Sequence, residues 1–210
     1  MKLRALVLLL LLASLGAATA SAQDWAKAQL NKSPRHSEWV DLKHDGRTVK
    51  AFVVYPEAKT KTAAVIVVHE IFGLTDWARE LADEIAAAGS IAIVPDLLTE
   101  PGKETQSYPD QGAAIKAVSA LQTPQVMADL DAAADYVKKL PACNGTISVA
   151  GFCWGGGRSF QYANHNPGPA AADVFSGTGP ARNAEAGNIK HPVSGVCRDG
   201  RRPRGATLPP

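Results

Sequence analysis

Short runs of continuous apolar residues alternate with helical segments along most of this chain. Residues 63–68, 91–94 and 146–150 have the length and uniform hydrophobicity of strands that are buried on both faces. Between them, apolar residues recur at spacings of three and four, as in amphipathic helices. Strands that alternate with helices pair in parallel, so the pattern predicts an α/β fold with a mostly parallel central sheet between two helical layers.

The remaining elements follow from the same periodicities. We expect further strands over residues 47–55 and 170–175, and helices over residues 76–88, 111–121, 125–140 and 156–164. The inner face of the third of these helices should consist of Val126, Leu130, Val137 and either Ala133 or Ala134. Residues 23–46 are polar, and we expect them to form an N-terminal extension with a short helix over residues 25–30 followed by a loop.

The N-terminus has the pattern of an export signal. Lys2 and Arg4 precede an apolar run that is too short to span a bilayer comfortably, and Ala20-Ser21-Ala22 fits the small-x-small cleavage pattern. We therefore predict a signal peptide over residues 1–22 and a periplasmic or secreted protein that leaves the membrane after cleavage. The alternative is an uncleaved membrane anchor.

Charge and composition narrow the classes of partner. The 210 residues contain 22 Lys and Arg against 20 Asp and Glu, and the loss of Lys2 and Arg4 would make the two numbers equal. Such a balance gives no support to a nucleic-acid partner. With 46% hydrophobic and 20% charged residues, the chain is typical of one soluble globular domain, which we expect to be a monomer. We find no metal or nucleotide motif and predict no cofactor.

The predicted strand over residues 146–150 leads directly into Gly151-Phe152-Cys153-Trp154-Gly155, and a helix follows. This is the layout of a nucleophile elbow with cysteine as the nucleophile. The glycines leave space where strand and helix backbones crowd each other, and the helix N-terminus favours a thiolate at Cys153. The backbone N–H of Trp154 would be one oxyanion donor. The alternative is an inert, buried cysteine in a glycine-rich turn.

A second motif, His69-Glu70-Ile71-Phe72-Gly73, follows the predicted strand over residues 63–68. Parallel strands present their carboxyl ends at one edge of a sheet, so this motif should lie beside Cys153. The backbone N–H of Ile71 is then placed to be the second oxyanion donor. We interpret Glu70 as functional, His69 as a structural residue that is hydrogen-bonded at the strand end, and Asp96 as a loop cap.

Three segments together carry a resemblance to a known family. VVHEIFGL, IVPDLL and SVAGFCWGGG resemble the dienelactone hydrolase family (carboxymethylenebutenolidases) of the α/β-hydrolase fold, over roughly residues 47–192. The resemblance implies hydrolysis of an enol-lactone or related small-molecule ester through an acyl-enzyme on Cys153. It also implies that Glu70 handles the thiol proton and that Ile71 and Trp154 form the oxyanion hole.

The resemblance also implies an Asp and then a His later in the chain, which this sequence does not supply in the family's setting. Asp199 is a weak candidate and is better interpreted as a solvated loop residue, and no histidine follows His191. We expect His165 at the far end of the sheet. Residues 194–210 are rich in arginine and proline and aperiodic. We therefore expect a truncated or frame-shifted copy, with a domain over residues 47–193 that lacks its last strand and helix and with impaired activity.

The cysteines leave two further functions open. Cys143, Cys153 and Cys197 form an odd set, so at least one thiol is unpaired. Cys143 and Cys153 flank a strand of about 17 Å, which is too long for a disulfide. If Cys153 is not a catalytic nucleophile, the chain could be a non-catalytic ligand-binding remnant or an exported redox-reactive thiol protein.

Overall fold

The computed structural model describes residues 23–177 and 187–196. The predicted signal peptide, Asp199 and Cys197 lie outside these residues. The described strands form one seven-stranded sheet in the order β1-β2-β4-β3-β5-β6-β7. The β1–β2 and β2–β4 pairs are antiparallel and all other pairs are parallel, which confirms the prediction of a mostly parallel sheet.

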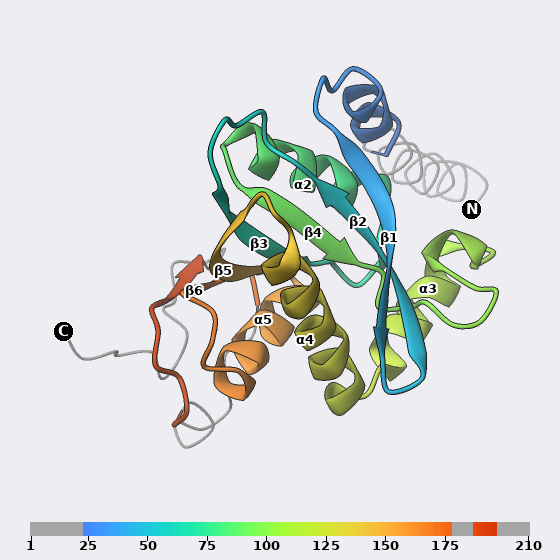
Figure 1. The fold of residues 1–210 in the computed structure, drawn as a ribbon. Helices are drawn as coiled ribbons and strands as arrows, with labels where there is room; N and C mark the ends of the chain where they lie inside the picture. Colours follow the sequence, from blue (N-terminus) through green and yellow to red (C-terminus); the bar gives the residue numbers. More distant parts are fainter. Residues whose placement is uncertain (1–22, 178–186, 197–210) are drawn as a thin grey trace, which may run out of the picture.

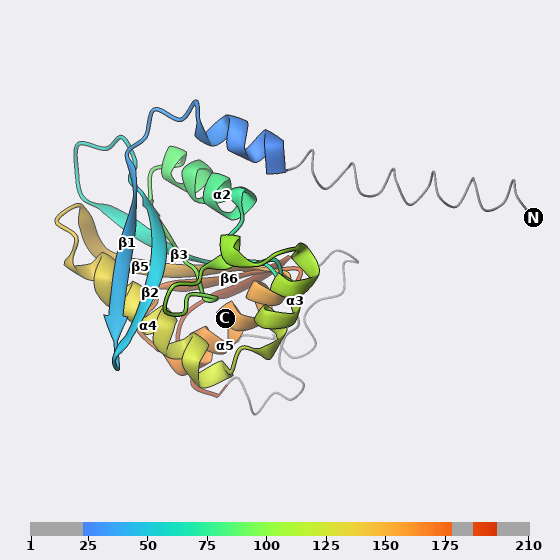
Figure 2. The ribbon, with the colours of Figure 1, turned by 90° about the vertical axis from the view of Figure 1, so that its right-hand side faces the viewer.

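Helices cover both faces of this sheet. Figure 2 shows α2 on one face and α4 and α5 on the other, and Figure 1 shows how α4 and α5 lie side by side. The strands are β1 (Ser37–His44), β2 (Arg47–Val54), β3 (Thr62–Val68), β4 (Ile91–Pro95), β5 (Cys143–Phe152), β6 (Ala171–Phe175) and β7 (Val193–Val196). The helices are α2 (Asp76–Ala87), α3 (Gln111–Ala120), α4 (Thr123–Lys139) and α5 (Trp154–His165), with a 3₁₀ turn at Thr105–Ser107.

The N-terminal segment differs from its prediction. Residues 23–30 are helical as expected, but the expected loop contains β1, which pairs with β2 along its whole length. An edge strand alternates weakly because its inward positions can stay polar, and here Glu38 faces inward and accepts a hydrogen bond from Tyr55 Oη at 2.8 Å. The available signal was Asp45-Gly46, since both residues have the positive φ that a tight hairpin turn needs (+44° and +77°).

The C-terminal boundary of the domain also differs from its prediction. β7 extends to Val196, three residues into the segment that we expected to be irregular. Its register is set by β6, with Ala172 opposite Val193 and Phe175 opposite Val196. Ser and Gly have low strand propensity, so the pairing with β6 rather than local sequence makes these residues a strand.

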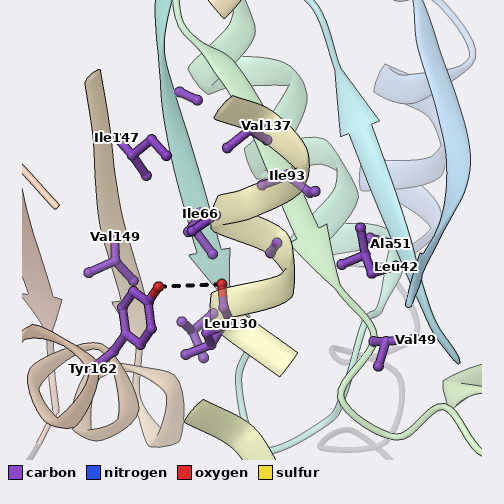
Figure 3. Packing of buried hydrophobic residues seen from close by; sticks show 14 of the residues in the cluster. Leu42, Val49, Ala51, Ile66, Ile93, Leu130, Val137, Ile147, Val149 and Tyr162 are labelled. Atoms are coloured by element: carbon purple, nitrogen blue, oxygen red, sulfur yellow. Dashed lines mark hydrogen bonds between the residues drawn. The ribbon is translucent and has the colours of Figure 1, made fainter. Parts of the chain in front are cut away.

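The larger hydrophobic cluster fills the space between the sheet and the α4–α5 layer (Figure 3). The predicted inner face of α4 is buried there. The sequence left open whether Ala133 or Ala134 belongs to this face, and both are buried. Tyr162 of α5 is fully buried and donates its hydroxyl to Asp131 Oδ1 at 2.9 Å, which satisfies the polar end of the ring. This packing fixes α5 against the sheet and thereby fixes the residue that precedes the helix.

The turn from β5 into α5 is a contact between backbones. A Cβ on Gly151 would lie 2.0 Å from the carbonyl oxygen of Gly155, and a Cβ on Gly155 would lie 2.3 Å from that of Val68 and 2.4 Å from that of His69. Both positions therefore need glycine, as the elbow pattern predicts. The contact also joins the first turn of α5 to the end of β3.

Cys153 lies at the apex of this turn with φ +53° and ψ −115°. This conformation is strained for a residue with a Cβ. The backbone N–H of Cys153 donates to the carbonyl oxygen of Phe175 at 2.9 Å, and the backbone N–H of Gly156 donates to the Cys153 carbonyl oxygen at 3.1 Å. The neighbouring strand and the helix thus hold the strained residue in place.

The variant Gly155→Ala should lower the free energy of unfolding by about 3 kcal/mol or more, because the atoms that its methyl group meets are backbone atoms that cannot turn aside. Urea denaturation measures the change. Gly145→Ala is the matched control: it has positive φ (+90°) and open space around its Cβ, so it should cost only about 1–2 kcal/mol. Equal costs for the two variants would contradict the backbone contact.

The variant Cys153→Gly should raise the free energy of unfolding by about 1 kcal/mol, since relief of backbone strain exceeds the entropy cost of glycine. Cys153→Ala keeps the Cβ and should show no such gain. Thermal unfolding of both variants and the parent chain checks this. If alanine and glycine stabilise the chain equally, strain at this residue is not the cause.

Candidate active site

Cys153 is exposed and stands at the N-terminus of α5, at the carboxyl edge of the sheet. The alternative expected a buried cysteine in this turn, and that part of it is wrong. Cys143 is a free, buried cysteine at the opposite end of β5, which agrees with the prediction that the two do not form a disulfide.

The structure brings the second motif to the same edge. β3 pairs in parallel with β5, with Val68 opposite Gly151, so the residues after each strand are neighbours. The imidazole of His69 stacks on the indole of Trp154 with ring centroids 5.7 Å apart and an interplanar angle of 13°. The side chains of Ile71 and Trp154 both pack against one small cluster that includes Leu98. Ile71 and Trp154, the two predicted oxyanion residues, are thus held by common neighbours.

A buried carboxylate anchors the loop that carries this motif. Asp96, just after β4, accepts hydrogen bonds from the backbone N–H of Thr105 at 2.7 Å and from its hydroxyl at 2.6 Å. The Thr105 oxygen in turn accepts from the backbone N–H of Leu74 at 3.0 Å. The interpretation of Asp96 as a loop cap is confirmed. The anchoring role of Thr105 was not foreseen, because nothing local in the sequence links it to Leu74.

The two titratable side chains of the motif have shifted pKa values. Glu70 is half-buried, and burial raises the pKa of its carboxyl group. His69 is fully buried, and burial lowers the pKa of its imidazole, although the charge of Asp96 acts in the opposite direction. The ring Nδ1 of His69 lies 2.8 Å from the carbonyl oxygen of Glu70, which confirms a structural hydrogen bond at the strand end.

Aromatic side chains and one cation surround the elbow. Phe152 stacks on Phe175 at 4.6 Å between centroids and meets Trp77 edge-on at 5.5 Å. The Arg158 guanidinium lies 4.8 Å from the Trp154 ring centroid, and burial lowers its pKa. Arg158 was not among the predicted residues. Its position four residues after Trp154 on a helix is the signal that could have found it.

Two histidines that follow the elbow in the sequence do not reach it. His165 ends α5, at the opposite edge of the sheet as expected, and its Nε2 lies 2.9 Å from Asp131 Oδ2. His191 is buried just before β7, which is also the amino-terminal edge because β7 is parallel to β6. His69 is therefore the histidine that the described residues place nearest to the elbow.

Residues 23–177 and 187–196 contain no cluster of three or more His, Cys, Asp or Glu side chains that could hold a metal ion. None of the helices in these ranges is long and apolar enough to cross a bilayer.

Comparisons with known proteins agree with this arrangement. The carboxymethylenebutenolidase of Pseudomonas putida is 32% identical over 124 residues, which are 57% of this chain and 52% of that protein. The chain spans about half the length of the curated relatives it matches.

Solved structures show the same fold. A protein from Klebsiella pneumoniae that is named as a dienelactone hydrolase is 29% identical, with a TM-score of 0.68 over 77% of this chain and 71% of that chain. The dienelactone hydrolase of Anabaena variabilis is 16% identical with a TM-score of 0.61, over 78% and 73% of the two chains, and supports the fold alone. The family model described as "Dienelactone hydrolase family" matches residues 49–199. The chain therefore belongs to the dienelactone hydrolase family and has the α/β-hydrolase fold.

Proposed function

We propose that this protein hydrolyses an ester or lactone bond with Cys153 as the nucleophile. The observation that carries the proposal is the exposed cysteine at a strained turn between a parallel strand and a helix N-terminus. A side chain in that position projects from the sheet edge and is accessible to a carbonyl compound. Family membership and the name of the Pseudomonas relative, a carboxymethylenebutenolidase, favour an enol-lactone or a related ester as the substrate class.

In the proposed first step, the Cys153 sulfur bonds to the substrate carbonyl carbon and the carbonyl oxygen becomes an oxyanion. The bond to the leaving oxygen then breaks, and that oxygen takes up a proton, which leaves a thioester. Water subsequently hydrolyses the thioester to a carboxylic acid and regenerates the thiol. In a lactone the leaving oxygen stays attached to the acyl chain, so the product is ring-opened.

The backbone N–H groups of Ile71 and Trp154 are the proposed oxyanion donors. Trp154 is the first residue of α5, so its N–H has no acceptor within the helix. Ile71 belongs to the loop that is anchored through Thr105. Donors that are fixed before the substrate arrives stabilise a developing oxyanion most effectively.

Glu70 is the proposed acceptor of the thiol proton. Its carboxylate forms no hydrogen bond or ion pair with any described residue, which leaves its oxygens available. A half-buried carboxylate with a raised pKa is a stronger base than an ordinary one and accepts a proton more readily.

Hydrolysis of the thioester is proposed to be slower than its formation. The second step needs a base to activate water, and the described histidines after the elbow, His165 and His191, lie at the opposite edge of the sheet. The proposed impairment therefore concerns turnover and not acylation of Cys153.

The full chain should release about one equivalent of p-nitrophenolate rapidly from p-nitrophenyl acetate, because Cys153 retains the acetyl group. Mass spectrometry should locate the acetyl group on Cys153. Cys153→Ala should lose the burst, whereas the matched control Cys143→Ala, which changes a buried thiol at the other end of β5, should keep it. Equal release by Cys153→Ala and the parent chain would remove the nucleophile from the proposal.

The variant Glu70→Gln should slow acylation of Cys153 by about 10²-fold at neutral pH, because an amide cannot accept the thiol proton. In the parent chain, the acylation rate should fall with decreasing pH at values above the ordinary pKa of a carboxyl group, since burial raises the pKa of Glu70. This acidic limb should be absent in Glu70→Gln.

Stopped-flow measurement of p-nitrophenolate release between pH 4 and pH 9 gives both results. Glu57→Gln is the matched control, because Glu57 is an exposed carboxylate in the β2–β3 turn, and its profile should equal that of the parent chain. An unchanged acidic limb in Glu70→Gln would assign the limb to another group.

A further inference from the structure

His69 makes a hydrogen bond that affects the direction of the backbone N–H of Ile71. Its Nδ1 lies 2.8 Å from the carbonyl oxygen of Glu70, so Nδ1 carries the ring proton and donates it to that oxygen. The same carbonyl oxygen accepts a second hydrogen bond, from the backbone N–H of Gly73 at 3.3 Å. Two donors therefore hold this carbonyl group in one orientation.

The Glu70 carbonyl and the Ile71 N–H belong to one peptide unit. A trans peptide is planar, so its C=O and N–H point in opposite directions and cannot turn independently. The donors that fix the Glu70 carbonyl oxygen thus also fix the direction of the Ile71 N–H. Nδ1 of His69 is the side-chain donor of this pair.

The same imidazole contacts the residue that carries the other proposed donor. Its ring is nearly parallel to the Trp154 indole at 5.7 Å. The backbone of His69 is also in contact with the first turn of α5, because a Cβ on Gly155 would lie 2.4 Å from the His69 carbonyl oxygen. One side chain therefore touches both Glu70, which precedes Ile71, and Trp154.

The ring is suited to a fixed, uncharged donor. It is fully buried, and its Nε2 has no hydrogen-bond partner among the described residues. Burial without a partner at Nε2 keeps the imidazole neutral, which leaves Nδ1 as its single donor. A buried Nε2 without a partner costs stability, so packing alone does not explain a histidine here.

We propose that His69 is a positioning residue that aligns the backbone N–H groups of Ile71 and Trp154 as a pair. The inference rests on the proposed function, in which these two groups stabilise the oxyanion. His69 does not touch the reacting atoms. It sets the direction of one donor through the Glu70 carbonyl oxygen and the place of the other through the stacked rings.

Two reactions of Cys153 separate this role from general damage to the site. Acylation by p-nitrophenyl acetate passes through an oxyanion, whereas alkylation by iodoacetamide displaces iodide and forms none. The full chain is treated with each reagent, and the ratio of the two rate constants is compared among variants. Thermal unfolding is measured in parallel.

His69→Phe keeps a flat ring against Trp154 but lacks the donor. Loss of an oxyanion donor costs about 10²–10³ in rate, so a misaligned donor should lower the ratio of acylation to alkylation by about tenfold or more. Alkylation itself should change little. Stability should change little, because the variant loses the hydrogen bond of Nδ1 but also removes Nε2, a buried polar atom without a partner among the described residues.

His69→Asn and His69→Gln form a matched pair that keeps the test decisive if phenylalanine prevents folding. The Asn amide lies close to the position of Nδ1 and can donate to the Glu70 carbonyl oxygen, whereas the longer Gln side chain places its amide near the position of Nε2. The ratio should be higher for Asn than for Gln. Equal loss of acylation and alkylation, or no loss in His69→Phe, would overturn the positioning role while the burst of the parent chain still supports the proposed function. A parent chain that is alkylated but never acylated at Cys153 would overturn both.

Discussion

The site depends on the close approach of three backbone segments around Gly155. The first turn of α5 lies so near the ends of β3 and β5 that no Cβ fits at Gly151 or Gly155. Because no side chain separates the segments, the helix N-terminus sits directly over the strand ends. Stacking of His69 on Trp154 follows from this approach, as does the proximity of the loop after β3 to Cys153. The side chains of the proposed site are thus placed by a contact between backbones that involves none of these side chains.

The loop after β3 is held at a second point, through residues that come from a different strand. The Thr105 hydroxyl accepts a hydrogen bond from the backbone N–H of Leu74 and donates one to Asp96, which is buried at the end of β4. Gly73 adopts φ +80° and has no room for a Cβ beside Thr105 Oγ1, at 2.5 Å. With the Glu70 carbonyl bonded at one end and Leu74 bonded at the other, the peptides between them have little freedom. Preorganised donors require such restraint, because reorientation during the reaction would cost part of the stabilisation that they provide.

The parts that the sequence predicted are those whose signals are local. The glycine spacing around Cys153, the strand that precedes it and the inner face of α4 depend on neighbours in the chain, and the structure has all three. The edge strands depend on a partner instead. β1 was missed because Glu38 and His44 occupy inward positions, and β7 was cut short because Ser194 and Gly195 are poor strand formers that take their conformation from β6. The contact of Arg158 with Trp154 was missed for another reason: α5 was predicted to begin two residues later, which left Trp154 outside the helix and hid the spacing of four.

Two features around the first turn of α5 lower the stability of the fold but suit the proposed catalytic role. Cys153 has a backbone conformation that a residue with a Cβ avoids, and His69 buries a ring nitrogen that has no partner in the part of the chain that the structure describes. Such features persist only where the surroundings enforce them, and here the enforcing elements are the Gly155 contact and the well-packed α4–α5 layer. A purely structural turn would relax with glycine in place of Cys153 and an apolar ring in place of His69. Cys153 adjoins the first turn of α5 in the sequence, and His69 adjoins it by stacking on Trp154. This placement is explained if the turn is built to hold a nucleophile and an oxyanion, as we propose.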